Sequence, residues 1–256
     1  MTFFSPSPPT PGTKVLVTGL GWISAVNSGC GTDKQRPRWD EGTPTIPASI
    51  LNSLKGGSRF GRLDLFSQIG VATVGLALQD AGYFQANHLA AAETDRQLRD
   101  NATSIALISS TTSSCNLTDR EFYKTVQNDP GLASPGLFVY TLATSFLGEA
   151  ALRFSLTGAS MAVIEPQPHA GAALTLACEE LLNGDDKVVV TGCCNLFEQN
   201  SAAPRFSGAL FLVLEKELKK TTRVHAVLSY DPETKLFFVK DQPCPDIFSL
   251  SELICG

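Results

Sequence analysis

The 256-residue chain lacks several features that would direct it to a particular class of function. It has no run approaching the ~20 apolar residues that cross a bilayer, and its N-terminus lacks the basic start and unbroken apolar core of a signal peptide. Its net charge of −5 gives no general attraction to nucleic acid, because such attraction needs clustered Lys and Arg. We therefore expect a cytoplasmic protein without nucleic-acid or membrane partners.

Histidine is scarce, and the cysteines are scattered. Neither residue type shows the short spacing of metal ligands, and an odd number of dispersed cysteines does not make a small secreted disulfide framework. We interpret the cysteines as reduced thiols and expect neither a metal nor a cofactor. The residues concerned are His88, His169, His225, Cys30, Cys115, Cys178, Cys193, Cys194, Cys244 and Cys255.

One glycine motif invites comparison with a dinucleotide-binding loop. Gly19-Leu20-Gly21 follows a strand pattern, as in loops whose backbone approaches a pyrophosphate at a helix start. However, Ser24 stands where the third glycine would be, and the following residues show no helical period. The sequence therefore argues against nucleotide binding.

Some histidines and cysteines could carry chemistry, but each has a plainer interpretation. His169 lies where a loop meets a helix, a position that often faces a cleft, whereas His225 in an apolar strand is most simply a structural ring with satisfied hydrogen bonds. Cys193-Cys194 end a strand, where parallel sheets open their sites, although buried cysteines are commoner. Cys115 would need an activating group that the sequence does not identify.

Alternating strand and helix patterns predict an α/β fold. The strand patterns are almost continuously apolar, which is typical of strands covered on both faces, so we expect a mostly buried mixed sheet layered between helices. The predicted strands are Lys14–Thr18, Ser104–Ser109, Met161–Ile164, Lys187–Thr191, Ala209–Leu214 and Val224–Ser229. The predicted helices are Leu65–Ala81, Thr141–Leu156 and Ala170–Leu182.

The remaining segments suggest one domain preceded by a flexible N-terminal arm. We expect a proline-rich arm over residues 1–13 and a single domain over 14–256. Residues 31–60 show no sustained period and are expected to form a long surface excursion that could touch a partner. Asp231-Pro232-Glu233-Thr234 predicts a hairpin turn.

Four separated segments resemble, in content and order, the N-terminal half of the β-ketoacyl synthases, a family with a thiolase-like fold. The family's opening strand is similar to VLVTGLGWIS at Val15–Ser24, and its next long helix is similar to GRLDLFSQIGVATVGLALQDAGY at Gly61–Tyr83. Two later segments are similar to SPGLFVYTLATSFLGEAALRFSLTG at Ser134–Gly158 and to SGALFLVLEKE at Ser207–Glu217. The resemblance covers about residues 14 to 215, and it implies that the family's second half is lacking.

The chain departs from the family pattern at the catalytic nucleophile. Condensing members present a cysteine at a helix start, within a segment like G-P-S-x-x-V-D-T-A-C-S-S, where the helix dipole lowers the cysteine pKa. The matching stretch, Gly158–Leu174, has Gln167 at that position, and an amide cannot carry an acyl thioester. The family's decarboxylating histidines and lysine have no counterpart. The plainer interpretation is that this segment has drifted and Gln167 has no role.

The resemblance implies a non-catalytic subunit like the chain-length factors of type II polyketide or polyene systems. Such a subunit forms a heterodimer with a catalytic ketosynthase and works with an acyl carrier protein. Two alternatives stay open: a malonyl-carrier-protein decarboxylase of the glutamine-ketosynthase type, and a scaffold that binds the acyl carrier protein.

The resemblance also implies an interface and a tunnel. A bare apolar edge strand invites association, and the family's equivalent strand pairs across the dimer. Bulky residues before and within the preceding helix would shape an acyl tunnel, although apolar residues of this kind are as readily explained as core. The interface residues are Ser160, Met161, Ala162, Val163 and Ile164, and the tunnel residues are Phe138, Leu142, Phe146 and Leu147.

Overall fold

The computed structural model describes residues 13–33, 35–40, 42–54, 60–83, 104–166, 171–197, 206–217 and 223–255. The proline-rich arm, apart from Thr13, lies outside these ranges, and so do Gln167, His88 and His169. No helix within the described ranges is long and apolar enough to cross a membrane.

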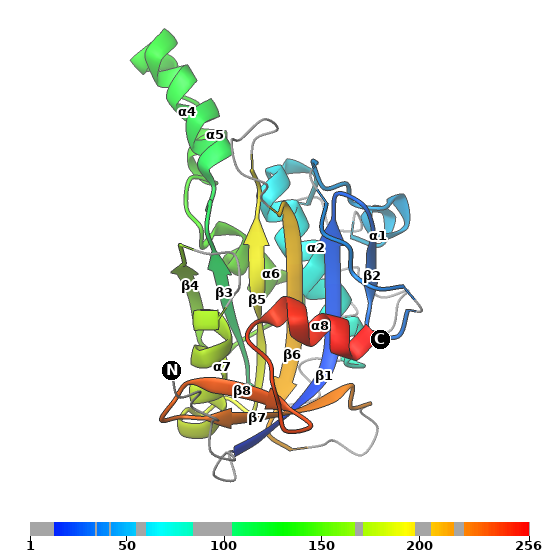
Figure 1. The fold of residues 1–256 in the computed structure, drawn as a ribbon. Coiled ribbons are helices and arrows are strands. Elements are labelled where there is room, and N and C mark those ends of the chain that lie inside the picture. The colour runs from blue at the N-terminus through cyan, green and yellow to red at the C-terminus, as the bar shows by residue number, and fades with distance from the viewer. Residues whose placement is uncertain are drawn as a thin grey trace, which may run out of the picture.

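The core of the fold is one twisted mixed sheet with helices on both faces (Figure 1). Its described strands follow the order β4-β3-β5-β6-β1-β7-β8-β9, and β2 pairs with β1. Strands β4 and β5 run parallel to β3, and the other pairs are antiparallel. The strands are β1 Thr13–Ser24, β2 Ser28–Cys30, β3 Ile105–Thr111, β4 Ser160–Ile164, β5 Val188–Asn195, β6 Gly208–Glu215, β7 Ala226–Asp231, β8 Leu236–Val239 and β9 Gln242–Pro243.

The predicted α/β fold with a buried mixed sheet is confirmed. Every residue of β3, β5 and β6 is buried, because helices cover both of their faces. The predicted hairpin also forms: β7 and β8 pair with Asp231 opposite Leu236, and Asp231 accepts hydrogen bonds from the Glu233 amide at 2.9 Å and the Thr234 hydroxyl at 2.7 Å.

One face of the sheet is covered by α2 (Leu65–Asp80) and α6 (Ser145–Phe154), with α1 (Ala48–Leu54) beside α2. Helix α2 matches its prediction: the Asp64 side chain caps its start, and Gly82 follows its end with φ of 79°. Helix α6 is shorter than predicted because residues 139–144 form turns and Ser155 leaves the helix in a left-handed conformation.

The opposite face is covered by α7 (Gly171–Asn183), α8 (Ile247–Cys255) and the β7–β8 hairpin. Figure 1 shows α8 crossing the sheet near the C-terminus. Helix α8 was not predicted from the sequence, although Ile247 and Leu250 are fully buried against the sheet.

The excursion over residues 31–60 is more firmly attached than predicted. Pro37, Pro44 and Ile46 are buried, and the Trp39 ring packs edge-on against Phe206 at 4.4 Å and Phe248 of α8 at 5.2 Å between ring centroids. The segment is therefore part of the packing that holds α8 on the sheet.

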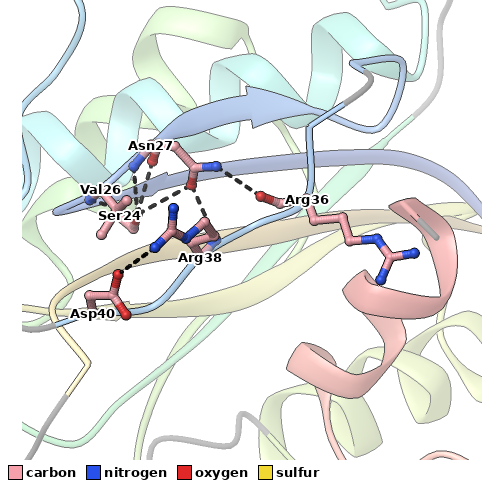
Figure 2. A network of polar contacts seen from close by, with 6 residues as sticks. All are labelled: Ser24, Val26, Asn27, Arg36, Arg38 and Asp40. Atoms are coloured by element: carbon pink, nitrogen blue, oxygen red, sulfur yellow. Dashed lines mark hydrogen bonds and ion pairs between the residues drawn. The ribbon is translucent and has the colours of Figure 1, made fainter.

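Polar contacts from Asn27 fix the path of this excursion (Figure 2). The Asn27 amide nitrogen donates to the Arg36 carbonyl at 2.8 Å, and its side-chain oxygen accepts from the Arg38 amide at 3.2 Å and the Trp22 indole at 3.1 Å. Ser24 donates its hydroxyl to the Asn27 carbonyl at 3.0 Å. One asparagine thus joins the end of β1 to the excursion.

The chain between β3 and α6 forms an arm that projects from the body of the molecule (Figure 1). It contains α4 (Asn116–Asn128), the short helix Pro130–Leu132 and α5 (Pro135–Phe138). Helix α4 is mostly exposed, and Thr118 is its buried residue. Helix α4 was not predicted from the sequence. Most of its residues are polar, so it lacks the high apolar content of the three predicted helices.

Candidate partner-binding edge and strand-end site

The predicted interface strand, β4, forms one edge of the sheet. It pairs in parallel with β3 from Leu107 opposite Ser160 to Thr111 opposite Ile164, and no strand in the described ranges pairs with its other side. Apolar side chains of β4 are exposed to solvent as well, since Met161 is 44% and Ile164 is 72% exposed. The edge therefore presents both unpaired backbone and apolar side chains.

The hydrogen bonds at the two ends of β4 define which backbone groups face outward. The Leu107 amide donates to the Ala159 carbonyl at 2.8 Å, and the Glu165 amide donates to the Thr111 carbonyl at 2.9 Å. Because backbone direction alternates along a strand, residues 161 and 163 face β3 as well. The N–H and C=O groups of Ser160, Ala162 and Ile164 consequently point away from the sheet.

The four predicted tunnel residues fall in two different environments. Phe146 and Leu147 are each 1% exposed and belong to the main core, where the Phe146 ring lies 5.4 Å from the Phe66 ring. Phe138 and Leu142 are 61% and 63% exposed. The tunnel stays a prediction, and the exposed pair is the part of it that another molecule could reach.

The arm carries further exposed apolar side chains near Phe138 and Leu142. We define the apolar arm surface as Tyr123, Leu132, Phe138, Val139 and Leu142, all of which are between 58% and 74% exposed. Phe138 packs against Phe122 of α4 with 5.5 Å between ring centroids. In Figure 1 the arm leaves the molecule on the same side as β4.

A polar cluster lies where the parallel strands β3 and β5 end. The Asn195 side-chain oxygen accepts from the Thr112 amide at 2.7 Å and the Thr111 hydroxyl at 3.2 Å. The Asn195 amide nitrogen is buried and has no hydrogen-bond partner in the part of the chain that the structure describes. Sites of α/β proteins open at this end of the sheet. Asn195 was not among the predicted site residues, although it directly follows the pair Cys193-Cys194.

The carboxylate of Glu165 occupies the N-terminus of α7. One of its oxygens accepts a hydrogen bond from the Ala172 amide, and the other is buried without a partner among the described residues. A carboxylate is favourable there because the helix dipole is positive at its N-terminus. This role of Glu165 was not predicted, although an acidic residue shortly before a predicted helix is the signal for it.

The candidate nucleophile Cys115 is poorly suited to attack. It is 3% exposed at the start of α4, where its sulfur lies 3.7 Å from an Asp119 carboxylate oxygen. Burial raises the pKa of the Cys115 thiol, and the Asp119 charge raises it further. Burial also raises the pKa of Cys193 and Cys194, which lie in the two cores.

We predict that Cys115 is alkylated by iodoacetamide more slowly than a free cysteine at pH 8. The raised pKa leaves less thiolate at this pH, so the rate should keep rising as pH passes the ordinary thiol value near 8.5. Mass spectrometry of the labelled peptide measures this rate, with Cys115→Ser as the control. A plateau below pH 8 would instead identify an activated thiol.

His225 has the satisfied ring that the sequence predicted, but it lies just before β7 and not inside a strand. Its Nε2 lies 2.7 Å from Oδ2 of Asp80, and the side chains of both residues are nearly or fully buried. Within the described ranges, no group of three His, Cys, Asp or Glu side chains could hold a metal.

Gly19 and Gly21 serve close packing between β1 and α2. A Cβ at Gly19 would lie 2.3 Å from the Ala77 carbonyl oxygen, and one at Gly21 would lie 2.6 Å from the Ala77 nitrogen. The glycines therefore let a strand and a helix touch, which accounts for the motif without a nucleotide.

Comparison with known proteins gives matches in structure alone. No family model and no curated protein matches the sequence. The chain is similar to a chain of the ishigamide ketosynthase/chain length factor, with a TM-score of 0.55 and 16% identity over 85% of this chain and 62% of that one. It is also similar to a β-ketoacyl synthase from Burkholderia phymatum, with a TM-score of 0.54 and 16% identity over 84% of this chain and 63% of that one.

A third similar structure is a complex of a type II polyketide synthase acyl-carrier protein with its ketosynthase. The TM-score is 0.57, with 16% identity over 87% of this chain and 71% of that one. This chain thus spans 62% to 71% of the length of these three structures. The shared architecture is the mixed sheet with helices on both faces. The chain has the thiolase-like fold of the ketosynthases.

Proposed function

We propose that this chain is a non-catalytic, chain-length-factor-like subunit that pairs with a catalytic ketosynthase. The observation that carries the proposal is the open edge at β4, where outward-facing backbone groups lie beside the exposed side chains of Met161 and Ile164. Unprotected edge strands tend to pair with another chain. The likeness in fold to a chain of a ketosynthase/chain length factor supports the same partner.

The residue types of the chain support a silent subunit. The sequence has Gln167 where condensing relatives have their cysteine, and a neutral amide cannot form an acyl thioester. The N-terminus of α7 already holds the Glu165 carboxylate, so the positive end of its dipole is less available to stabilise a thiolate. The buried cysteines Cys115, Cys193 and Cys194 have raised pKa values.

The apolar arm surface suggests how the subunit affects its partner. Its exposed side chains would be covered when a ketosynthase pairs along β4, since both lie on one side of the molecule. In that complex Phe138 and Leu142 would line the acyl tunnel, and their bulk would limit the length of the growing chain. The acyl chain itself would arrive on an acyl carrier protein.

A pair of proline substitutions tests the edge. Ala162→Pro removes an N–H that points away from the sheet, so the chain should fold while its affinity for the ketosynthase falls at least about tenfold through the lost backbone bond and the steric clash. Val163→Pro removes an N–H that faces β3 and should destabilise the chain instead. Native mass spectrometry of the co-expressed pair measures assembly, and circular dichroism measures folding.

Three results would contradict the proposal. An unchanged heterodimer with Ala162→Pro would show that β4 does not pair with the ketosynthase. Carbon dioxide release from malonyl carrier protein by the purified chain would identify a decarboxylase. A stable carrier-protein complex in the absence of any ketosynthase, with no heterodimer in its presence, would identify a scaffold.

A further inference from the structure

A cavity of about 640 Å³ lies far along the sheet from β4, between β7, the β8–β9 hairpin and α8. Its wall is built from β1, β7 and the hairpin, and Leu253 of α8 closes one side. This volume falls in the range of ordinary small-molecule pockets. Neither the free edge nor the strand-end cluster contributes a residue to it.

The cavity combines an apolar wall with two unpaired cations. Val227 and Leu253 are 41% and 54% exposed, so the wall offers apolar surface that is open to a ligand. Lys14 and Lys240 also line the cavity, and neither has an ion-pair partner within the described part of the chain. Among the described lining residues Asp241 is the one carboxylate, so these residues carry more positive than negative charge, on a chain whose net charge is −5.

One lining residue, His225, belongs to a buried pair with Asp80. One Asp80 oxygen lies 2.7 Å from Nε2 of His225 and accepts from the Leu20 amide at 2.9 Å, and the other accepts from the Thr32 amide at 3.0 Å. These contacts hold the side chain of His225, one of the residues that line the cavity, against Asp80 and the backbone of β1.

The rim of the cavity is a tight turn in an unusual conformation. Lys240 and Asp241 connect β8 to β9 with φ of 50° and 63°, in a two-residue hairpin that usually contains Asn or Gly. The favoured two-residue hairpin turn needs left-handed backbone at both positions, which costs a lysine more than Asn or Gly. Asn or Gly at position 240 would suit this backbone conformation better but would remove the positive charge that Lys240 places beside the cavity.

We propose that this cavity binds a small organic anion: a carboxylate, sulfonate or phosphate group attached to an apolar body. Lys14 and Lys240 hold the anionic group, and Val227 and Leu253 contact the apolar body. The site is independent of the ketosynthase partner, because β4 lies at the opposite end of the sheet order.

The test uses the whole chain and two fluorescent probes of nearly the same shape. The anionic probe is 8-anilinonaphthalene-1-sulfonate, and the neutral probe is N-phenyl-1-naphthylamine. In the double variant Lys14→Met with Lys240→Asn, the dissociation constant of the anionic probe should rise about tenfold, because two charge-assisted contacts are lost. The neutral probe should bind with unchanged affinity, and added salt should weaken only the anionic probe.

The variants are chosen so that folding is preserved. Asn tolerates the left-handed conformation at position 240, and Met keeps most of the length of the Lys14 side chain. Lys187→Met is the matched control, and it should change neither probe because Lys187 is an exposed lysine just before β5 that does not line the cavity. Unchanged binding of the anionic probe in the double variant, or an equal loss of both probes, would overturn the proposal.

Discussion

Replacing Phe146 with Ala is expected to lower the free energy of unfolding by about 3–5 kcal/mol. The ring is 1% exposed and packs edge-on against Phe66 at 5.4 Å and against Phe211 of β6 at 6.1 Å. It also lies directly over Gly70 of α2, where an added Cβ would come within 2.5 Å of it. Truncation would therefore open a cavity between α2, α6 and the sheet, and these elements cannot easily collapse into it.

Urea unfolding followed by circular dichroism measures this loss. Leu142→Ala is the matched control, because that side chain is 63% exposed and its removal should change stability by less than about 0.5 kcal/mol. A Phe146→Ala variant as stable as the wild type would show that the ring is not core. The result also guides tunnel experiments: changed product length in Phe146→Ala would be confounded by instability, whereas Phe138→Ala and Leu142→Ala avoid this problem.

Replacing Gly21 with Ala is expected to destabilise the fold by about 3 kcal/mol or more through overpacking. The new Cβ would lie 2.6 Å from the Ala77 nitrogen and 2.8 Å from the Thr73 carbonyl oxygen. Both are backbone atoms of α2, so no flexible side chain can move aside, and β1 must shift away from the helix. Since β1 also pairs with β6 and β7, the strain would spread through the centre of the sheet.

Gly148→Ala provides the opposite expectation within the same fold. Gly148 is exposed in the middle of α6, and no atom lies within 4 Å of the position of its Cβ. Alanine should therefore stabilise the chain by about 0.5–1 kcal/mol through its better helix propensity. Thermal unfolding of Gly21→Ala and Gly148→Ala separates the cost of a steric clash from the gain in helix propensity. If both substitutions changed stability equally, the close contact between β1 and α2 would not be what makes alanine unfavourable at position 21.

Local pattern was sufficient for the long strands and for three helices. Apolar runs predicted β1 and β3 to β7. In β3, β5 and β6 the run is continuous because these strands are buried on both faces, whereas β4 and β7 have apolar runs although they are partly exposed. Periodicity and end signals located α2 within a residue of its observed bounds, since Asp64 and Gly82 cap it locally. The arm helix α4 and the terminal helix α8 were missed, because one buries little and the other depends on distant aromatic contacts.

For the candidate sites too, some features follow from the sequence and others only from the tertiary structure. The sequence alone determined the α/β class, the presence of an apolar strand at Ser160–Ile164 and the amide at position 167, since each depends on residue type and order. Only the tertiary structure decided that β4 is an edge, that Phe146 is core while Phe138 is exposed, and that Lys14 and Lys240 share a cavity with His225. The physical reason is that exposure, edge position and cavity formation depend on which distant segments contact one another. Local patterns in the sequence do not specify those long-range contacts.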